Sequence, residues 1–536
     1  MLKLIKKHLD SKLIKLSLAL SLIYLLLFNS VIFIHKFRYY NVTFVKAILE
    51  LSKDFIYVYF SCFIIFFGLT IQRLVFIIGT IFLFITGSIA SYYLYLFKIS
   101  PSQQMITSFF ATNFSEVYEI TSLKLIIWII FSLSIAIYTM KHFSVLDSKL
   151  FITKLISAIC LFIAINNVLS PQFKMLQGYF PIQYLHNTYL FLSKDNKKNN
   201  KKSNKKTPVR EDVNKKFSFI SNADSDVIAV LVIGESARFD HFGINNYDRD
   251  TTPHLSTVKN LFAFKAQSSS NHTIISVPSL LSRYPASELD ESLEETSFLS
   301  IFTTLGFNTS WIGTQTLIGY LKTKAQTTIY DEVNFVLLPG GSLLLKMGDY
   351  DEKMLPYIEN ILSRPSKQLL VLHTLGSHWD YSARHPKEFQ KFLPSCSVTA
   401  HQDQTDCDQE GLINKYDNSI LYTDFFLYNV ISLLKDKNSF LIYVSDHAES
   451  LGEDGYYGHG GPMIKEQTTV PFIVWVSDEF KAKHPELVNS IASHVGNEIS
   501  HDYVFHSMLD CAGINSKAID HNLSLCSQKA PIIGLQ

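Results

Sequence analysis

Net charge is almost absent from this chain of 536 residues. Its 48 Lys and Arg residues stand against 47 Asp and Glu residues, which gives a formal charge of +1. A nucleic-acid-binding protein usually carries a clear basic excess, so we expect no nucleic-acid partner. Cysteine is also scarce: the chain has six, and no two have the CxxC spacing of a zinc ribbon.

Charged residues are nearly missing from five long apolar segments in the first third of the chain. These segments are Leu18–Ile34, Phe55–Ile71, Leu74–Phe97, Leu125–Met140 and Phe151–Leu169. Each is close to the length that a helix needs to cross a bilayer. The alternative, helices buried in a soluble core, would leave the protein too little polar surface. The sequence therefore predicts a five-helix transmembrane domain over residues 1–170.

Basic residues predict the orientation of these spans. Lysines crowd the chain before the first span, Arg73 follows the second span, and Lys141 and Lys149 follow the fourth. The positive-inside rule places these residues in the cytoplasm, so everything after about residue 170 is exported. Three lysines fall on the other side: Lys36, Lys46 and Lys98. The first span lacks a small-residue cleavage site and is followed by further spans, which favours an anchor over a signal peptide.

The cysteines are distributed in agreement with this topology. Cys62 and Cys160 lie in predicted spans, whereas the exported part holds Cys396, Cys407, Cys511 and Cys526. Their close spacing favours disulfides between Cys396 and Cys407 and between Cys511 and Cys526, in an oxidising compartment. Unpaired core thiols of a cytosolic protein are the alternative.

A connecting region, residues 171–216, separates the spans from the rest of the chain. Met175–Leu192 is rich in aromatic and aliphatic residues and predicts an amphipathic stretch along the membrane interface. Lys194–Lys216 is dominated by lysine and asparagine and lacks apolar periodicity, which is typical of a solvated linker. Its lysines suggest contact with anionic lipid head groups.

The remainder, residues 217–536, alternates strands with helices. The candidate strands are Val227–Ile233, Phe307–Ile312, Leu369–Leu375, Phe440–Val444 and Pro471–Val476. Helix-length segments such as Glu410–Lys435 separate them. This alternation predicts an α/β layered domain with a largely parallel sheet.

Reactive side chains follow three of the predicted strands. Glu235 comes directly after the first strand, Asp446 and His447 after the fourth, and His378 after the third. Open α/β sheets place their chemistry at the carboxyl ends of their strands, so we expect these side chains to converge. Two carboxylates and imidazole nitrogens are ligands suited to zinc, and less well to manganese. Glu235 alone could belong to any strand that meets a helix; the convergence favours a metal site.

A nucleophile is expected beside such a metal. The segment QSSSNHTIISVPSLLSRY places several hydroxyls at the start of a predicted helix, where backbone amides can hold an anion. We select Thr273, because metal binding would make its hydroxyl a competent nucleophile at neutral pH. The alternative is that these hydroxyls only cap the helix.

Six motifs in the exported part resemble those of the membrane-bound phosphoethanolamine transferases, which modify lipopolysaccharide. They are GESARFDHFGINNYDRDTTP, NHTIISVPSLLSR, VLHTLGSHWDYSARHP, NKYDNSILYTD, SDHAESLGEDGYYGHG and KEQTTVPF. The resemblance runs in order through essentially the whole exported domain and extends to the five spans. It implies an alkaline-phosphatase or sulfatase fold for residues 217–536.

The resemblance also implies roles for individual residues. It assigns the zinc ligands, for one or two ions, to Glu235, Thr273, Asp446 and His447, with Thr273 as the residue that carries phosphoethanolamine. His378 and His459 match histidines at the substrate phosphate. Thr112 and Glu116 match residues of a membrane-domain loop that binds the donor lipid.

One departure concerns the segment around Thr273. Many relatives have cysteines flanking this segment, whereas the corresponding positions here are Ser269 and Ser279. The disulfide of those relatives is therefore absent. We expect the loop to be more mobile or to be held by hydrogen bonds.

The resemblance implies a transferase in the bacterial inner membrane, multi-pass, with its catalytic domain in the periplasm. Thr273 would attack phosphatidylethanolamine, and the covalent phosphoethanolamine would pass to lipopolysaccharide, either lipid A or Kdo and the inner-core sugars. The segment GSHWDY favours a core sugar slightly. Such a modification would weaken the attraction of lipid A for cationic peptides such as polymyxin.

Three other functions are considered. A phosphoglycerol transferase would share the anchor, the threonine and the metal. A hydrolase of the same fold, such as a phosphatase or sulfatase, would share the metal site, but sulfatases mature a cysteine or serine and Thr273 cannot undergo that reaction. An inactive scaffold would not need a complete set of ligands.

Overall fold

A computed structural model describes most of the chain. It covers residues 11–39, 44–111, 121–142, 151–169, 175–200, 211–288, 295–315, 332–337, 350–396 and 407–527. Internal contacts divide the chain into two compact units. The first comprises residues 1–107 and 121–205, and the second comprises residues 108–120 and 206–536.

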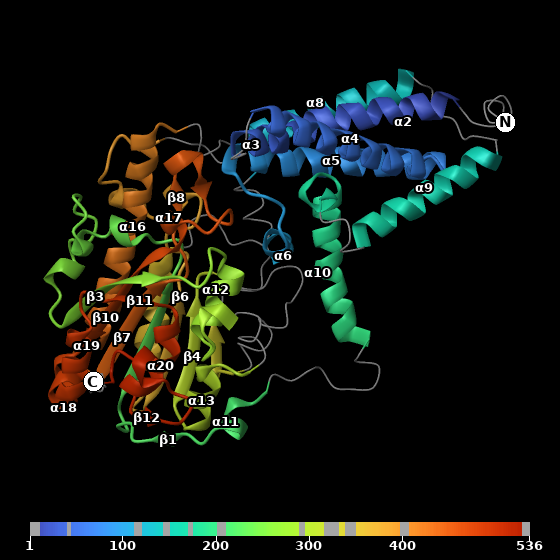
Figure 1. Cartoon of the computed structure of the whole chain (residues 1–536). Coiled ribbons are helices and arrows are strands. Elements are labelled where there is room, and N and C mark those ends of the chain that lie inside the picture. The colour runs from blue at the N-terminus through green and yellow to red at the C-terminus, as the bar shows by residue number, and fades with distance from the viewer. Residues whose placement is uncertain are drawn as a thin grey trace, which may run out of the picture. The chain divides into compact units, whose positions relative to one another are not determined.

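The first unit consists of long apolar helices (Figure 1). Its helices are α2 (Ser11–Tyr24), η1 (Leu25–Asn29), α3 (Ser30–Tyr39), α4 (Phe44–Leu69), α5 (Arg73–Phe97), α8 (Leu123–His142), α9 (Phe151–Leu169) and α10 (Ile182–Asn200), together with the first five residues of α6 (Gln103–Ala111). Five helical runs are long and apolar enough to cross a membrane: Ser11–Phe37, Phe44–Leu69, Arg73–Phe97, Leu123–His142 and Ile152–Leu169. The prediction of five apolar spans is thus confirmed.

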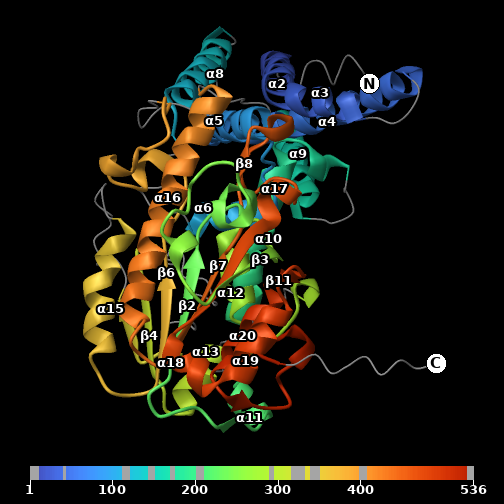
Figure 2. The ribbon, with the colours of Figure 1, turned by 90° about the vertical axis from the view of Figure 1, so that its left-hand side faces the viewer.

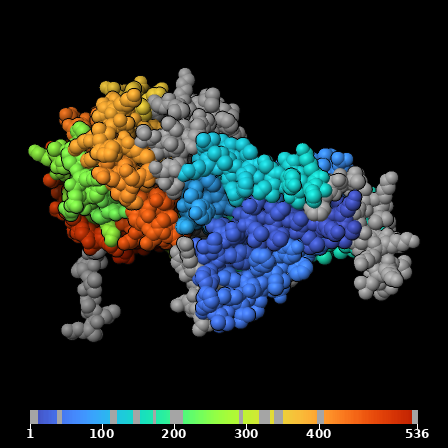
Figure 3. Space-filling view, turned by 90° about the horizontal axis from the view of Figure 1, so that it is seen from above, coloured from blue at the N-terminus to red at the C-terminus, as the bar shows by residue number. Residues whose placement is uncertain are grey.

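Aromatic side chains fill the interior of this helical unit. The ring of Phe28 lies edge-on to Tyr24, with centroids 4.7 Å apart, and edge-on to Phe84 at 5.5 Å. The outer faces of the same helices, drawn blue to cyan in Figure 3, keep large apolar side chains such as Ile78 exposed. Apolar residues on the outside as well as the inside are what a lipid environment requires.

The connecting region packs on the helical unit more closely than the sequence suggested. The side-chain amide of Asn29 donates to the carbonyl of Phe180 at 3.0 Å and accepts from the amide of Phe180 at 2.9 Å. Phe180 is buried among the spans. Helix α10 continues to Asn200, so the stretch that we expected to be a solvated linker from Lys194 begins as helix. Lysine has a high intrinsic helix propensity, so a lysine-rich stretch can form a helix even where the sequence shows no apolar periodicity.

The second unit is built on a sheet of eight strands. In spatial order they are β11 (Glu498–Ser500), β3 (Leu261–Gln267), β10 (Thr469–Val476), β7 (Ser439–Ser445), β2 (Ile228–Gly234), β6 (Gln368–His373), β4 (Asn308–Gly313) and β5 (Phe335–Leu337). β10 pairs antiparallel with both of its neighbours, and the other pairings are parallel. The predicted largely parallel sheet is confirmed.

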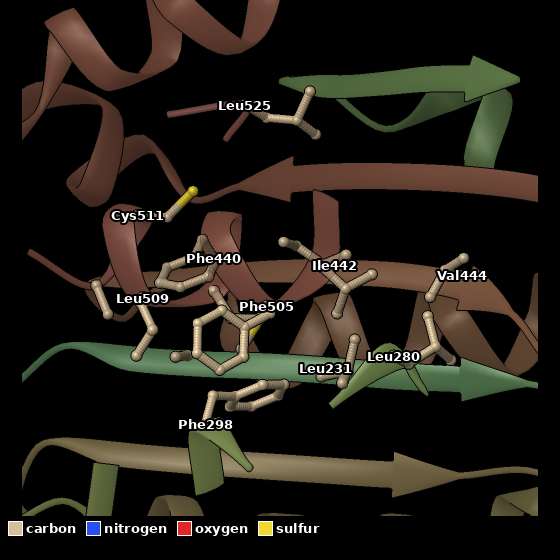
Figure 4. Packing of buried hydrophobic residues seen from close by; sticks show 14 of the residues in the cluster. Leu231, Leu280, Phe298, Phe440, Ile442, Val444, Phe505, Leu509, Cys511 and Leu525 are labelled. Carbon is tan, nitrogen blue, oxygen red and sulfur yellow. The ribbon is translucent and has the colours of Figure 1, made fainter. Parts of the chain in front are cut away.

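Both faces of the central strand β2 are buried, as its uninterrupted apolar sequence predicts. Ala229, Leu231 and Ile233 belong to a core with α12 (Thr273–Leu280), α13 (Phe298–Thr304) and α20 (Asp502–Cys511). Ile228, Val230 and Val232 belong to a core with α15 (Leu355–Leu362) and α16 (Gln409–Leu434). Figure 2 shows the sheet between these helix layers, and Figure 4 shows Leu231 and Phe440 in the first core.

Strand β3 was not predicted from the sequence. Its burial alternates along Phe264, Lys265, Ala266 and Gln267, because one face lies towards solvent. Such a strand lacks the continuous apolar run that marks β2. The five predicted strands are present, each within two residues of its expected bounds, although the last one, β10, is antiparallel.

Candidate active site

The order of the strands brings Glu235 and Asp446 together. β2 lies between β7 and β6, and Gly234 pairs with Ser445 in the last step of the β2–β7 ladder. The residues that follow are Glu235 and Asp446, and the amide of Asp446 donates to the carbonyl of Gly234 at 2.9 Å. Both carboxyl groups are fully buried.

The turn after Glu235 ties this pair together. Ser236 has a φ of 57°, in the left-handed region, and its amide donates to Oδ1 of Asp446 at 3.3 Å. The hydroxyl of Ser236 donates to Oε1 of Glu235 at 2.7 Å. His447 also donates its amide to Oδ1 of Asp446, at 2.7 Å. The carboxylates are therefore held by short, local hydrogen bonds.

Thr273 completes this group of side chains. It is the first residue of α12, and its hydroxyl oxygen lies 3.1 Å from Oε2 of Glu235 and 3.1 Å from Nε2 of His447. Nε2 of His447 lies 3.3 Å from Oε1 of Glu235 and 3.4 Å from Oδ2 of Asp446. The structure thus brings together the four residues to which the sequence assigned a metal.

Three imidazoles at the site share one orientation. In each, Nδ1 lies within hydrogen-bonding distance of a main-chain carbonyl: His447 with Ala448 at 3.1 Å, His459 with Asn271 at 3.0 Å and His378 with Trp379 at 2.7 Å. A carbonyl can only accept, so Nδ1 carries the proton and Nε2 of a neutral ring keeps its lone pair. Metal-binding histidines are commonly oriented in this way.

The two buried carboxyl groups have opposite pKa shifts. Burial, together with the nearby charge of Glu235, raises the pKa of Asp446 well above its ordinary value. Burial also acts to raise the pKa of Glu235, but the neighbouring imidazoles of His447, His378 and His459 bring it down to about 2. Two ionised carboxylates so close together repel each other, and a cation between them would allow both to stay ionised.

The donor atoms fit a metal ion in two overlapping groups. Glu235, Asp446 and His447 offer ligand atoms that all lie within 4.8 Å of one another, and Glu235, His378 and His459 do the same. Burial lowers the pKa of His447, and it lowers the pKa of His459 to about 4, so both rings are neutral and able to coordinate at pH 7. Carboxylate oxygens and neutral imidazole nitrogens form a donor set typical of zinc.

The loop before Thr273 is held by hydrogen bonds. The amide of Ser269 donates to Nδ1 of His501 at 3.2 Å, and Nε2 of the same ring lies 2.9 Å from the carbonyl of Ser445. His501 therefore connects this loop to the end of β7, next to Asp446. This contact agrees with the second of our two expectations for a loop that has Ser269 and Ser279 in place of cysteines.

The remaining predicted residues divide into two groups. Disulfides join Cys396 to Cys407 and Cys511 to Cys526, with Cα atoms 5.7 and 5.2 Å apart. Thr112 and Glu116, predicted to bind the donor lipid, lie outside the described residues.

Sequence reasoning missed residues that hold the site through the main chain. Asn271 orients His459 with its carbonyl, and a carbonyl leaves no side-chain signature in a sequence. Ser236 could have been found, because it directly follows Glu235 in the motif GES. His501 is remote in sequence and follows a short edge strand, so no pattern indicated its contact with the Thr273 loop.

Comparison with known protein families matches two parts of the chain. The sulfatase model matches residues 228–514, and the model of phosphoethanolamine transferase EptA/EptB matches residues 59–181. The chain is 32% identical over 333 residues to phosphoethanolamine transferase EptA of Salmonella typhimurium, covering 59% of each protein. It is 29% identical over 327 residues to the Kdo(2)-lipid A phosphoethanolamine 7''-transferase of the same organism, covering 58% of the chain and 56% of that relative. These matches span less than two thirds of either relative.

Solved structures show the same architecture. The integral membrane lipooligosaccharide phosphoethanolamine transferase A of Neisseria meningitidis matches with a TM-score of 0.77 at 22% identity, covering 96% of this chain and 99% of that one. The periplasmic domain of EptC from Escherichia coli, in a complex with Zn, matches with a TM-score of 0.52 at 25% identity, covering 60% of this chain and 91% of that one. The chain therefore belongs to the sulfatase family, and its residues 59–181 are similar to the phosphoethanolamine transferases EptA and EptB.

Proposed function

We propose that this protein transfers phosphoethanolamine from phosphatidylethanolamine to lipopolysaccharide, through a covalent intermediate on Thr273. The observation that carries the proposal is the position of the Thr273 hydroxyl, 3.1 Å from both Glu235 and His447 at the first residue of α12. The matches to EptA and to the Kdo(2)-lipid A transferase support this class of reaction.

The first half-reaction forms a bond between Oγ1 of Thr273 and the donor phosphorus. The phosphorus–oxygen bond to diacylglycerol breaks, and the departing oxygen takes up a proton. The backbone amides at the start of α12 and the helix dipole stabilise negative charge on the phosphoryl oxygens. In the second half, an acceptor oxygen attacks the same phosphorus, and Thr273 leaves and regains its proton.

Glu235, Asp446, His447 and Thr273 would hold a metal ion, and we propose Zn²⁺ as that ion. The donor set favours zinc over manganese, and the Zn complex of the related EptC domain supports the choice. A bound Zn²⁺ lowers the pKa of a coordinated hydroxyl and makes it nucleophilic at neutral pH. The second group, with His378 and His459, could hold a second ion.

His378 and His459 are proposed to contact the phosphoryl group. The ring of His459 stacks on His447, with centroids 4.1 Å apart, and lies 6.5 Å from the ring of His378. Because burial lowers its pKa to about 4, His459 is neutral at pH 7, and its Nε2 can accept a hydrogen bond from the attacking hydroxyl. Both imidazoles are partly buried, and we propose that one of them protonates the leaving group.

The membrane location follows from the proposed substrates. Donor and acceptor are both lipids, and five helices long and apolar enough to span a bilayer support a location in the same membrane. We propose the bacterial inner membrane, with the sulfatase-like unit in the periplasm, where the two disulfides would be stable. Thr112 and Glu116 are proposed to bind the donor.

The acceptor is proposed to be lipid A or a Kdo or inner-core sugar. The relatives include both an EptA enzyme and a Kdo(2)-lipid A 7''-transferase. Mass spectrometry of lipid A and core fractions, from cells with and without the protein, would locate the added group. Absence of phosphoethanolamine from both fractions would contradict the proposal.

Release of diacylglycerol tests the donor. The purified full chain in detergent is incubated with phosphatidylethanolamine or with phosphatidylglycerol, and Thr273→Ala serves as the inactive control. We expect release from phosphatidylethanolamine alone. Release only from phosphatidylglycerol would favour a phosphoglycerol transferase, and release of phosphoethanolamine to water without acceptor would favour a hydrolase.

A further inference from the structure

Arg384 holds the segment that carries His378. This segment follows β6, and Arg384 reaches it from the end of the short helix η10 (Tyr381–Ala383). Its Nε donates to the carbonyl of His378 at 2.9 Å, and its Nη2 donates to the carbonyl of Trp379 at 2.7 Å. Arg384 is only 8% exposed, so these two hydrogen bonds are shielded from competition with water.

The carbonyl of Trp379 is shared between Arg384 and His378. It lies 2.7 Å from Nδ1 of His378 as well as 2.7 Å from Nη2 of Arg384. Because this oxygen is fixed by the guanidinium, the Nδ1–H of His378 has a fixed acceptor. The proton is therefore kept on Nδ1, and the lone pair of Nε2 is left for the site shared with Glu235 and His459.

A buried ion pair braces the same segment from the other side. Nζ of Lys415, on α16, lies 2.5 Å from Oδ1 of Asp380 and 5.2 Å from the ring centroid of Trp379. Lys415 is completely buried. Asp380 in turn accepts from the amide and the hydroxyl of Ser382 and so caps η10. The peptide unit that Arg384 binds is thus anchored on both sides.

We propose that Arg384 is a positioning residue for His378: it fixes the ring orientation and tautomer that present Nε2 to the phosphoryl group. Arg384 contacts the main chain of His378 and Trp379, and in this proposal it acts on the reaction through the imidazole. The catalytic importance of this contact rests on the proposed transferase function, whereas the control of the ring orientation does not. The planar fork of arginine binds two carbonyls at once, which the single ammonium of lysine cannot do.

A double-mutant cycle tests whether Arg384 acts through His378. Transfer is measured for the full chain in detergent, for Arg384→Met, His378→Ala and the double variant. We expect Arg384→Met to lower kcat by about 10- to 100-fold with little change in KM, as for other residues that orient an active-site imidazole. In the His378→Ala background the same change should lower kcat by less than about 2-fold, because the effects of residues that act as a unit are not additive. Equal losses in both backgrounds, or no loss in the single variant, would overturn the proposal.

Two further variants separate positioning from folding. Arg384→Lys keeps the positive charge but not the contact with both carbonyls. We expect it to recover less than half of the kcat that Arg384→Met loses. Arg249→Met removes a half-buried arginine that binds the side chains of Asn414 and Asp417 instead of the carbonyls of His378 and Trp379, and we expect unchanged kcat. Full recovery by Arg384→Lys would show that charge alone is needed and would also overturn the proposal.

Carbethoxylation of His378 gives a readout that needs no activity. The metal-loaded full chain is treated with diethyl pyrocarbonate, and the rate of modification at His378 is followed by peptide mass spectrometry. We expect the rate to rise at least about 3-fold in Arg384→Met, while partly exposed His254 reacts as in the parent. An unchanged rate at His378 would refute the positioning. If the parent protein transferred nothing from any donor, the proposed function would fail, and this experiment would still decide the role of Arg384.

Discussion

The hydroxyl oxygen of Thr273 lies 3.1 Å from Oε2 of Glu235, although 38 residues separate the two in the chain. The contact arises because β2 ends at Gly234 and α12 begins at Thr273, at the same edge of the sheet.

Replacing Glu235 should weaken metal binding most strongly, because Glu235 belongs to both groups of ligand atoms. We expect Glu235→Gln to lower zinc affinity by at least about 100-fold, more than is usual for residues that only orient ligands. Each protein is dialysed against a chelator, and the zinc that it retains is measured by inductively coupled plasma mass spectrometry. The exposed Glu498→Gln, which loses only an ion pair with Lys265, should retain metal as the parent does. Equal zinc in Glu235→Gln and the parent would exclude Glu235 as a ligand.

The sulfatase-like unit should lose stability in mild acid through His506. Burial lowers the pKa of this ring to about 4, and its Nδ1 accepts from the amide of Asp520 at 3.0 Å. The unfolded chain takes up a proton near the ordinary pKa of about 6.5, whereas the folded chain does not. The stabilisation is therefore complete above about pH 6.5 and is lost as the pH falls towards 4.

The variant His506→Asn removes this titration and keeps an acceptor near the position of Nδ1. Between pH 6.5 and 5 the parent should lose up to about 2 kcal/mol more of its unfolding free energy than the variant. Denaturant unfolding of both proteins at several pH values measures the difference. Parallel pH profiles would show that His506 does not contribute.

Reduction of the Cys511–Cys526 disulfide should lower the melting temperature. Both cysteines are buried in the core beside α20, and the bond closes a loop with a sequence separation of 15. Loss of such a cross-link costs about 3 kcal/mol, mainly through the greater entropy of the unfolded chain. The double variant Cys511→Ser, Cys526→Ser should melt earlier than the parent in scanning calorimetry, whereas Cys160→Ser, which changes a free cysteine, should not. Equal melting temperatures of the double variant and the parent would contradict this.

Continuous apolar runs made much of the fold predictable. The spans are apolar on all sides, as helices that face lipid must be, and β2 is apolar on both faces because it lies between two helix layers. In both cases the sequence shows an uninterrupted apolar run. Strand β3 has one solvent-facing side and depends on pairing with β10 for its existence, which local sequence does not reveal. The helical start of the lysine-rich stretch, in α10, was also missed, because no apolar periodicity marks it.

The site was predictable where a side chain follows a strand directly. Glu235 and Asp446 could be placed together because both come after central strands, and the parallel order then makes them neighbours. Arg384 and His501 could not be found from the sequence. Each binds main-chain atoms of a residue that only tertiary packing brings close to it. The family resemblance supplied His459, whose place after the short strand β9 (Tyr457–Gly458) gives no such signal.

The most direct test is the intact mass of the protein after incubation with phosphatidylethanolamine and no acceptor. We predict that the parent gains the mass of one phosphoethanolamine group, that fragmentation places it on Thr273, and that Thr273→Ala shows no adduct. Addition of lipopolysaccharide should then remove the group from the parent. An adduct that persists in Thr273→Ala, or that maps to another residue, would contradict the assignment of Thr273 as the nucleophile.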